Sequence, residues 1–460
     1  MGRPRLADRD DRVVVGLVIW LAFTLPFDFW GLHSIGPCLF RSSSNLSCPY
    51  GYDYDTSTVG TTIISEWDLV CDHQYVINLI QMIIMFGSLL GSAIFGIAAD
   101  KYGRRTCLLI SCFIRFVFGV LSGAATNVTN FAVLRFLLAL FDGGIHSMAM
   151  IMCLEVLSGR YRLILSIIFQ MSFYLGFPLM AYVTYLTKNW RYTQIILYTS
   201  SFLTFFCTWM SPESPRWLLT LGKKESAINV LEKAARKNKR EFHAVKKLVH
   251  ASTNEEKHVI EGSCFWLKLF NTPKLRNRTI LSCVNGLVLF LITYGVLQYF
   301  GEFSSNPFFD LFLQGLTGMI GCAIAAGAVV KYNRRTTIAL TFVIIALCSC
   351  VKIGFPTNRC IDIACSAIIY CCVGVETALI EPFVGELFPT VLRNSGYGVF
   401  MMCANLGAII APIFVSLVND YASLPLISFC ILSLIEVFFV LLLPDIQNKK
   451  LPDTIEDVEE

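Results

Sequence analysis

Apolar residues along this chain come in long, nearly continuous runs rather than in the short alternating pattern of half-buried strands. Each run is close to the roughly 20 residues that a helix needs to cross the hydrocarbon core of a bilayer. The pattern therefore predicts an all-α polytopic membrane protein with 12 transmembrane helices. The runs cover residues 13–33, 76–99, 106–125, 130–154, 163–187 and 193–211, and then 279–300, 307–330, 336–354, 362–384, 396–418 and 424–443.

Composition agrees with the pattern. Of the 460 residues, 55% are hydrophobic and 15% are charged, and the mean hydropathy is +0.62. Soluble domains carry about 25% charged residues. These values argue against a soluble enzyme, a nucleic-acid binder and a disordered scaffold, and the continuous runs argue against a β-barrel.

The charged residues predict an orientation. Segment 34–75 holds one basic residue, Arg41, and five acidic ones, whereas basic clusters follow the even-numbered spans. The positive-inside bias therefore predicts that 34–75 is extracellular and that the termini, 1–12 and 444–460, are cytoplasmic. The basic clusters lie at 101–105, 159–162, 212–278, 331–335 and 449–450.

Two glycosylation sequons agree with this orientation, because Asn45 and Asn127 both fall in predicted external segments. The loop 34–75 also holds Cys38, Cys48 and Cys71, an odd number that leaves at least one thiol without a partner inside the loop. Which of the three would pair stays open.

The stretch 212–278 is the one sizeable soluble segment. Within it, residues 225–236 carry apolar side chains at helical spacing, which predicts a short amphipathic helix. This linker would either lie against anionic lipid headgroups or dock a regulatory partner.

The second half of the chain repeats marks of the first. Lys101 returns as Lys331, 230 positions later, and Glu155 returns as Glu386, 231 positions later. The repeat predicts two parallel six-helix halves, 13–211 and 279–443, with a substrate site between them at mid-membrane.

Charged residues at the predicted cytoplasmic helix ends are candidates for a gate. Glu155 and Arg162, like Glu386 and Arg393, are seven residues apart and are expected to lie two turns along one helix face. Such ion pairs can break and reform as the halves rock, although charges there also serve simply to fix topology. The gate candidates are Asp100, Arg104, Arg105, Glu155, Arg162, Glu213, Arg216, Glu386 and Arg393.

Several motifs resemble the major facilitator superfamily and, more narrowly, the organic cation/anion/carnitine transporters of solute carrier family 22. The resemblance runs from about residue 54 to the C-terminus. It implies the major facilitator fold and alternating-access transport of amphiphilic organic ions, by facilitation or exchange rather than by ATP hydrolysis. The motifs are Ser65-Glu-Trp-Asp-Leu-Val-Cys71, Pro212-Glu-Ser-Pro-Arg-Trp-Leu218, Glu386-Leu-Phe-Pro-Thr-Val-Leu-Arg-Asn394 and Leu451-Pro-Asp-Thr-Ile-Glu-Asp457.

This sequence departs from the family pattern at positions that inform on substrate charge. Gly318 stands where cation transporters of the family often carry Glu, and Asn405 stands where Asp or Arg separates cation from anion members. The repeated basic loop carries Val330 where an Asp is usual. The charge of the substrate therefore stays open, and the loop 34–75 is much shorter than in relatives.

Ionisable residues inside spans are expensive to bury and are functional candidates by default. They are Asp28, Arg135, Asp142, His146, Asp310, Glu376 and Glu381. Glu376 and Glu381 are five residues apart, so we expect only one of them to face a cavity. The resemblance implies that His146 and Gln170 line the cavity, and aromatic rings there, Tyr370 included, would suit an organic cation. The predicted substrate-binding set is His146, Gln170, Asn285, Phe290, Tyr294, Glu376, Glu381 and Asn405.

The sequence thus favours transport of a small organic ion, whether cation, anion or zwitterion, across a lipid bilayer. The alternatives are a sugar-porter-like transporter, or a receptor or scaffold on the same fold that does not transport. We find no catalytic signature and no motif for a metal, a cofactor or a nucleic acid. Coupling to a proton or to a counter-substrate is left open.

Overall fold

The long apolar runs of the sequence form long helices, as the computed structural model shows. Eleven of the 12 predicted spans lie on helices, and the first, 13–33, lies outside the described residues. Ten helices in the described part of the chain are long and apolar enough to cross a membrane. The structure describes residues 60–70, 73, 75–156, 160–237, 269–299, 307–356, 358–390, 392–418, 424–444, 452 and 456–459.

The N-terminal half contains the second to sixth predicted spans. The sixth is divided at Ser200, whose hydroxyl donates to the carbonyl oxygen of Leu197 at 2.5 Å. Such back-bonding by serine competes with the helical ladder. The membrane helices of this half are α5 (Tyr75–Tyr102), α6 (Arg104–Gly123), α7 (Val128–Val156), α8 (Arg160–Thr187), α9 (Trp190–Thr199) and α10 (Ser201–Met210).

The C-terminal half contains six long helices. Local signals set several of their starts: Pro273 opens the first of them, and the Asn358 side chain caps another by accepting from the backbone N–H of Cys360. The helices of this half are α15 (Pro273–Tyr299), α16 (Pro307–Lys331), α17 (Arg334–Gly354), α18 (Arg359–Leu387), α19 (Arg393–Val418) and α20 (Leu424–Leu442).

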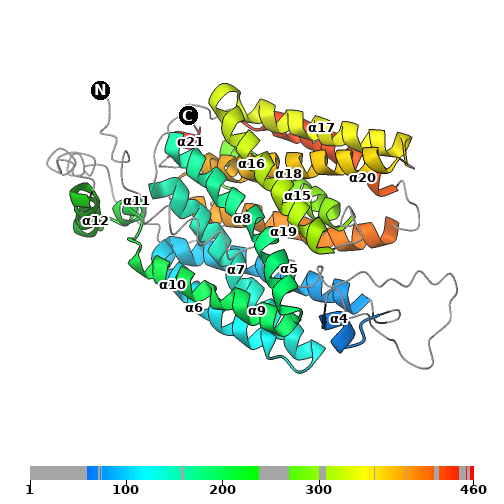
Figure 1. Ribbon diagram of the computed structural model, residues 1–460. Helices are drawn as coiled ribbons and strands as arrows, with labels where there is room; N and C mark the ends of the chain where they lie inside the picture. Colours follow the sequence, from blue (N-terminus) through cyan, green and yellow to red (C-terminus); the bar gives the residue numbers. More distant parts are fainter. Residues whose placement is uncertain are drawn as a thin grey trace.

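Four short helices lie at the two ends of the bundle. In Figure 1, α11 (Pro215–Thr220), α12 (Lys224–Lys237) and α21 (Glu456–Glu459) lie at one end, and α4 (Ile63–Glu66) lies at the other. We call the first end the basic face, because the clusters 101–105 and 331–335 lie there, and the second the opposite face. The helix α12 covers the amphipathic stretch 225–236 expected from the sequence.

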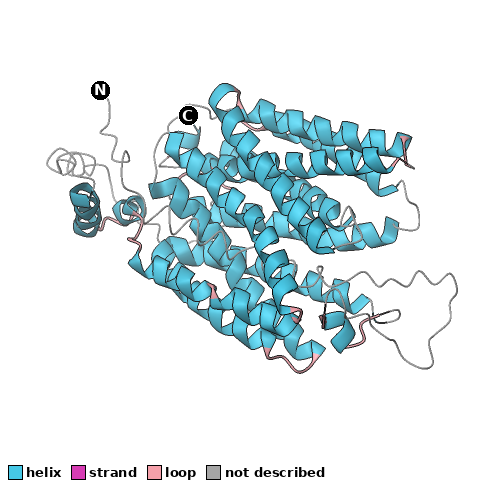
Figure 2. Ribbon diagram, in the orientation of Figure 1, coloured by secondary structure: helices cyan, strands magenta, loops and turns pink. Residues whose placement is uncertain are grey.

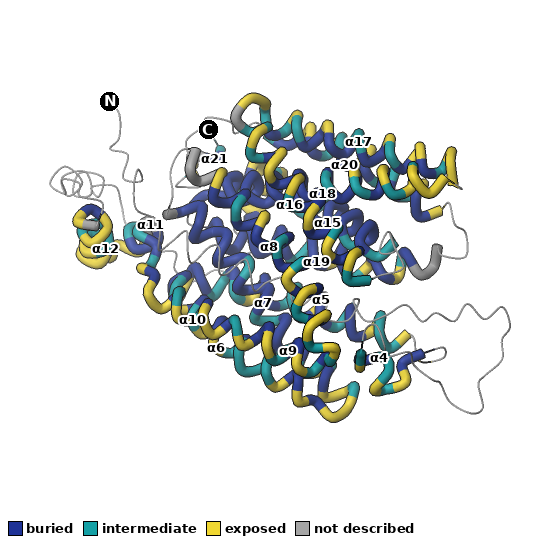
Figure 3. The backbone as a smooth tube through the Cα atoms, in the orientation of Figure 1, coloured by how far each residue is buried: buried dark blue, intermediate teal, exposed yellow. Residues whose placement is uncertain are grey.

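The halves contact each other along two helix pairs. Helix α5 packs against α19, and α8 packs against α16 (Figure 1). The first contact is close enough to need glycine, because a Cβ atom on Gly398 would lie 2.7 Å from the carbonyl oxygen of Ser92. Figure 2 shows that helices make up nearly all of the described chain, and Figure 3 shows the buried residues concentrated where the halves meet.

The helix boundaries overturn one prediction. Glu155 lies in the last turn of α7 and Arg162 belongs to α8, while Glu386 lies in the last turn of α18 and Arg393 begins α19. Neither pair lies along one helix face. Pro389 gives the reason in the second case, since proline disfavours a helical conformation in the residue before it.

Candidate functional site

A pocket lined mainly by aromatic side chains lies between the two halves. One wall comes from α8 of the N-terminal half and the others come from α15, α16 and α18 of the C-terminal half. Tyr294, predicted as a binding residue, lines it, and so does Tyr370. The lining residues are Phe173, Tyr174, Phe177, Thr293, Tyr294, Leu297, Gln314, Tyr370 and Val373.

A polar cluster centred on Glu381 of α18 lies at the same interface. The hydroxyl of Tyr397 in α19 donates to Glu381 Oε2 at 3.0 Å, and His146 Nε2 of α7 lies 3.5 Å from the same oxygen. The side-chain amide of Gln170 in α8 lies near the same carboxylate. Four helices from both halves therefore converge on one carboxylate, whose side chain is 4% exposed.

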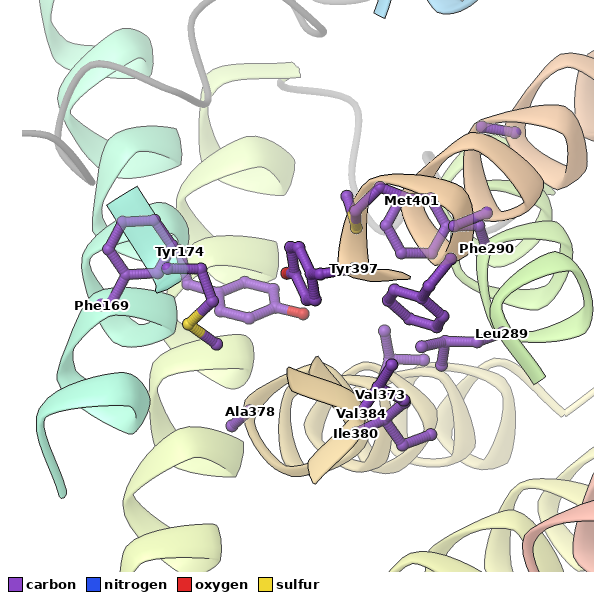
Figure 4. Packing of buried hydrophobic residues seen from close by; sticks show 14 of the residues in the cluster. Phe169, Tyr174, Leu289, Phe290, Val373, Ala378, Ile380, Val384, Tyr397 and Met401 are labelled. Atoms are coloured by element: carbon purple, nitrogen blue, oxygen red, sulfur yellow. The ribbon is translucent and has the colours of Figure 1, made fainter. Parts of the chain in front are cut away.

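The pocket and the polar cluster adjoin each other. The hydroxyls of Tyr174 and Thr377 lie 2.9 Å apart across the two halves. Thr377 is one turn before Glu381 on α18, so both residues lie on one face of that helix. Figure 4 shows the Tyr397 side chain between Tyr174 of α8 and Phe290 of α15.

Gly318, where the family resemblance implies that cation transporters often carry Glu, packs closely against Tyr174. A Cβ atom on Gly318 would lie 2.1 Å from the ring of Tyr174. The tyrosine ring therefore fills the space that a larger side chain on α16 would need. A carboxylate at position 318 is incompatible with this packing of α8 on α16.

Other predicted binding residues do not line the pocket. The Phe290 ring packs against Tyr294, with 5.5 Å between ring centroids. Asn285 and Asn405 are buried, and each donates its side-chain N–H to the backbone carbonyl oxygen four residues earlier, at 2.7 Å and 2.9 Å. Their roles in binding remain predictions.

Glu376 faces away from this site. It is fully buried inside the C-terminal half, where the carboxylate of Glu436 in α20 is near enough to act on it electrostatically. We expected only one of Glu376 and Glu381 to face a cavity, and that expectation remains a prediction, because neither lines the pocket. Asp28 lies outside the described residues, and Asp310 is buried at the start of α16.

Sequence reasoning missed several ionisable residues inside spans, among them Arg115, Lys352 and Glu436. Arg115 pairs with Asp142 at 2.6 Å, and Lys352 pairs with Asp362 at 2.7 Å. Each of the three interrupts an apolar run, so the criterion that selected Glu381 would have found them as well.

Several predicted gate residues meet on the basic face around Asp100 of α5. Its carboxylate accepts a hydrogen bond from the backbone N–H of Ser395 at 3.0 Å and another from the Ser395 hydroxyl at 2.8 Å. The side-chain amide of Asn394 donates to it at 3.2 Å. Because these donors lie in the first turn of α19, a carboxylate of one half is bound by a helix N-terminus of the other.

A second group of gate residues surrounds Glu155. Arg104 Nη2 lies 3.1 Å from Glu155 Oε1 and also 3.1 Å from Asp100. The Ser214 hydroxyl donates to Glu155 Oε2 at 2.7 Å, and Arg393 of the other half approaches Oε1 at 3.8 Å. These side chains are almost fully buried, so the ion pairs are poorly screened by solvent.

The motif beginning at Pro212 makes hydrogen bonds to the backbone beside these gate residues. Glu213 accepts from the backbone N–H of Arg105 at 3.1 Å, and Trp217 Nε1 donates to the Asp100 carbonyl oxygen at 2.8 Å. The Arg105 side chain donates to the carbonyl oxygen of Trp209. The side chains of Arg162 and Arg216 lie outside the description, so their gate roles remain predictions.

The C-terminal half carries a related pair. Arg334 Nη1 lies 2.9 Å from Glu386 Oε2, in the place that Arg104 and Glu155 take in the other half. Arg393 also donates to the carbonyl oxygen of Pro452, which lies in the C-terminal motif beginning at Leu451. That motif therefore contacts the turn between α18 and α19.

Residues of the Ser65–Cys71 motif, on the opposite face, attach α4 to the N-terminal half. The guanidinium of Arg191 and the indole N–H of Trp190 both donate to Glu66, and these bonds hold the pKa of that carboxyl below its usual value of 4.5. The Trp67 ring packs against Trp190 and Phe131. Asn127 is exposed at the same end, whereas Asn45, Cys38, Cys48 and Cys71 lie outside the described residues.

Comparisons with known proteins agree with the fold. A family model described as "Sugar (and other) transporter" matches residues 46–305, and one described as "Major Facilitator Superfamily" matches residues 332–458. The proton:xylose symporter XylE, in complex with a bromodeoxyglucose, has a similar solved structure. The TM-score is 0.74 at 14% identity, and the match covers 97% of this chain and 98% of that one.

Curated relatives are more similar in sequence. The organic cation transporter protein of Drosophila melanogaster is 31% identical, over 91% of this chain and 78% of the relative. Solute carrier family 22 member 3 of Mus musculus is also 31% identical, over 91% of this chain and 75% of the relative.

Among the described residues, no group of three His, Cys, Asp or Glu side chains could hold a metal ion.

Proposed function

Because the chain belongs to the major facilitator superfamily and, within it, to solute carrier family 22, we propose that it carries small organic cations across the plasma membrane by alternating access. One of its relatives, from Drosophila melanogaster, is named as an organic cation transporter protein. The observation that carries the proposal is an aromatic pocket that lies between the halves and adjoins Glu381, a buried carboxylate.

The contacts between the halves support alternating access. On the basic face, Asp100 and Glu155 of one half reach α19 of the other, so this end is closed. These contacts are hydrogen bonds and ion pairs, which can break and reform without unfolding either half. A rocking motion that separates α5 from α19 would open the pocket toward the basic face.

The chemistry of the pocket favours a cation over an anion. Tyrosine and phenylalanine rings present electron-rich faces that attract ammonium groups. Glu381 makes no ion pair with a Lys or Arg side chain among the described residues, whereas the buried carboxylates of the gate do. An organic cation can supply the missing positive charge.

The proposed orientation follows from the loops. The basic face would be cytoplasmic and the opposite face, with Asn127, extracellular and glycosylated. The linker 212–278 and the tail 444–460 would then lie in the cytoplasm, together with both termini. Protease protection and glycosidase sensitivity in intact cells would test this orientation.

An uptake assay tests the proposed function. Cells with the protein at their surface should accumulate labelled tetraethylammonium, and a negative membrane potential or an outward proton or counter-substrate gradient should supply the drive. Carnitine, an organic anion and xylose serve as competing substrate classes. Uptake of xylose instead would favour the sugar-porter alternative. Binding of tetraethylammonium without flux would favour a receptor, and neither binding nor uptake of any class would refute the proposal.

A further inference from the structure

Glu381 is a carboxylate buried between the halves, and no Lys or Arg among the described residues pairs with it. Its described neighbours are neutral donors and rings from five packed helices, and the only basic group among them is the imidazole of His146. Among the described residues, the titratable or polar groups that face it are His146 of α7, Gln170 and Tyr174 of α8, Tyr294 of α15, Cys322 of α16 and Tyr397 of α19.

An ionised carboxylate in such a place is strongly unfavourable unless a cation accompanies it. Two kinds of cation can do so here. A proton can bind to Glu381, with the hydroxyl of Tyr397 and the amide of Gln170 still nearby, or an organic cation in the adjoining pocket can balance the charge. Both neutralise the same group, so they compete for it.

From this arrangement we propose that the protein exchanges protons for organic cations, with Glu381 as the shared site and His146 as the group that relays its proton. This inference rests on the proposed cation transport and adds the coupling ion. When the cation arrives, the O–H bond of Glu381 breaks and the carboxylate pairs with the cation. The proton then passes to His146 Nε2, 3.5 Å away, and leaves on the side to which the site is open.

The position of His146 suits this relay. It belongs to the N-terminal half, whereas Glu381 belongs to the C-terminal half, so their separation changes whenever the halves rock. Its other ring nitrogen, Nδ1, has no hydrogen-bond partner among the residues that the structure describes. That atom is therefore able to pass a proton to water when the cavity opens.

The coupling predicts accumulation without a membrane potential. In proteoliposomes held at zero potential with potassium and valinomycin, an interior one pH unit more acidic than the exterior should drive about tenfold accumulation of tetraethylammonium, because one unit corresponds to a factor of ten. A trapped pH dye should report that the interior becomes more alkaline as the cation enters. Cation flux with neither accumulation nor proton movement would overturn the inference but leave the proposed function intact.

Variants assign the coupling to this site. Glu381→Gln should lose both the accumulation and the dye signal, and His146→Gln should slow the dye signal at unchanged thermal stability. Glu436→Gln is the matched control, since it removes a buried carboxylate of the same half that lies away from the pocket, and it should behave as wild type. Proton-coupled accumulation that survives in Glu381→Gln would refute the assignment. If Glu381→Gln does not fold, the wild-type measurements decide: cation flux without accumulation or proton movement overturns the exchange.

Discussion

At the basic face, the two halves of the bundle carry the same repeated sequence marks, but the charged residues there make different contacts. In the N-terminal half, the carboxylate of Asp100 pairs with Arg104 of its own half and is also bound by the first turn of α19 in the other half. In the C-terminal half, Glu386 pairs with Arg334 of the same half, and position 330, the counterpart of Asp100, is Val. The repeat therefore preserves the pairing within each half, while the contact between halves depends on a residue that it does not preserve.

This difference assigns the ion pairs within a half to stability and the contacts between halves to gating. An arginine–glutamate pair inside one half holds helices of that half together in every state of the transport cycle. A carboxylate that binds the N-terminus of a helix in the other half is made when this end closes and lost when it opens. Glu155 belongs to both classes, because it pairs with Arg104 of its own half and approaches Arg393 of the other.

The largest expected effect comes from Glu155→Gln. This change removes the carboxylate that Arg104 and Arg393 share, although Arg104, 1% exposed, keeps Asp100, and Arg393, 0% exposed, keeps its bonds to backbone carbonyl oxygens. Breaking a buried ion pair on one side lowers the free energy of unfolding by about 3–5 kcal/mol. The midpoint of thermal inactivation in detergent and the surface abundance should both fall steeply.

Glu386→Gln is the matched variant in the other half. Arg334 is more exposed, at 10%, so water can solvate part of its charge. We expect a smaller loss of about 1–3 kcal/mol. Equal losses in the two variants would show that the halves do not differ in the way described.

A smaller effect, on gating rather than on stability, is expected for Asp100→Asn. The change removes the charge that binds Ser395 and Asn394, and a hydrogen bond to a charged group contributes about 1.5–3 kcal/mol. The opening of the basic face should therefore become at least about tenfold more frequent. The rate at which N-ethylmaleimide labels buried Cys153, quantified by mass spectrometry, should rise accordingly.

Asp362→Asn provides the control for this measurement. Asp362 pairs with Lys352 inside the C-terminal half and away from α19, so its loss should leave labelling of Cys153 unchanged. If Asp100→Asn labels no faster than wild type, the bond to α19 does not hold this end closed.

The smallest effect concerns the opposite face. Glu66 pairs with Arg191 at 2.5 Å, but 35% of its side chain is exposed, so screening limits the pair to less than about 1 kcal/mol. Because folding lowers its pKa below 4.5, its contribution is present above that pH and is lost as the pH falls through the folded-state value. The difference in thermal stability between wild type and Glu66→Gln should be visible at pH 7 and shrink as the pH falls below 4.5.

The sequence pattern predicted most of the fold, because the lipid around each membrane helix requires that helix to be apolar. A span must be apolar along its whole length whatever its neighbours are, so the runs located helices such as α5 and α20 without any knowledge of packing. The same reasoning failed between elements. Glu386 and Arg393 were expected on one helix, but the turn at Pro389 separates them and gives each a different partner.

The candidate site was only partly predictable. Glu381, His146 and Gln170 were chosen separately, as an ionisable residue in a span and as positions implied by a family resemblance, and nothing in the sequence indicated that they would meet. Glu376 satisfied the same criterion but faces the interior of one half. Because the two residues are five positions apart on α18, their side chains point to different sides of the helix, one to the interface between the halves and one to the core of one half. The number of apolar residues in a run does not reveal which side of the helix meets which neighbour.

By itself, the sequence determined that the chain crosses a membrane many times, that it is built from two repeated halves and that charges collect at one end. Those properties follow from the cost of placing polar groups in lipid, which acts on each residue alone. Only the tertiary structure decided that Asp100 binds the other half, that Tyr174 fills the space beside Gly318, and that Glu381 meets His146 rather than an arginine. Those outcomes depend on which faces of distant helices come together, and that is set by packing among all the helices at once.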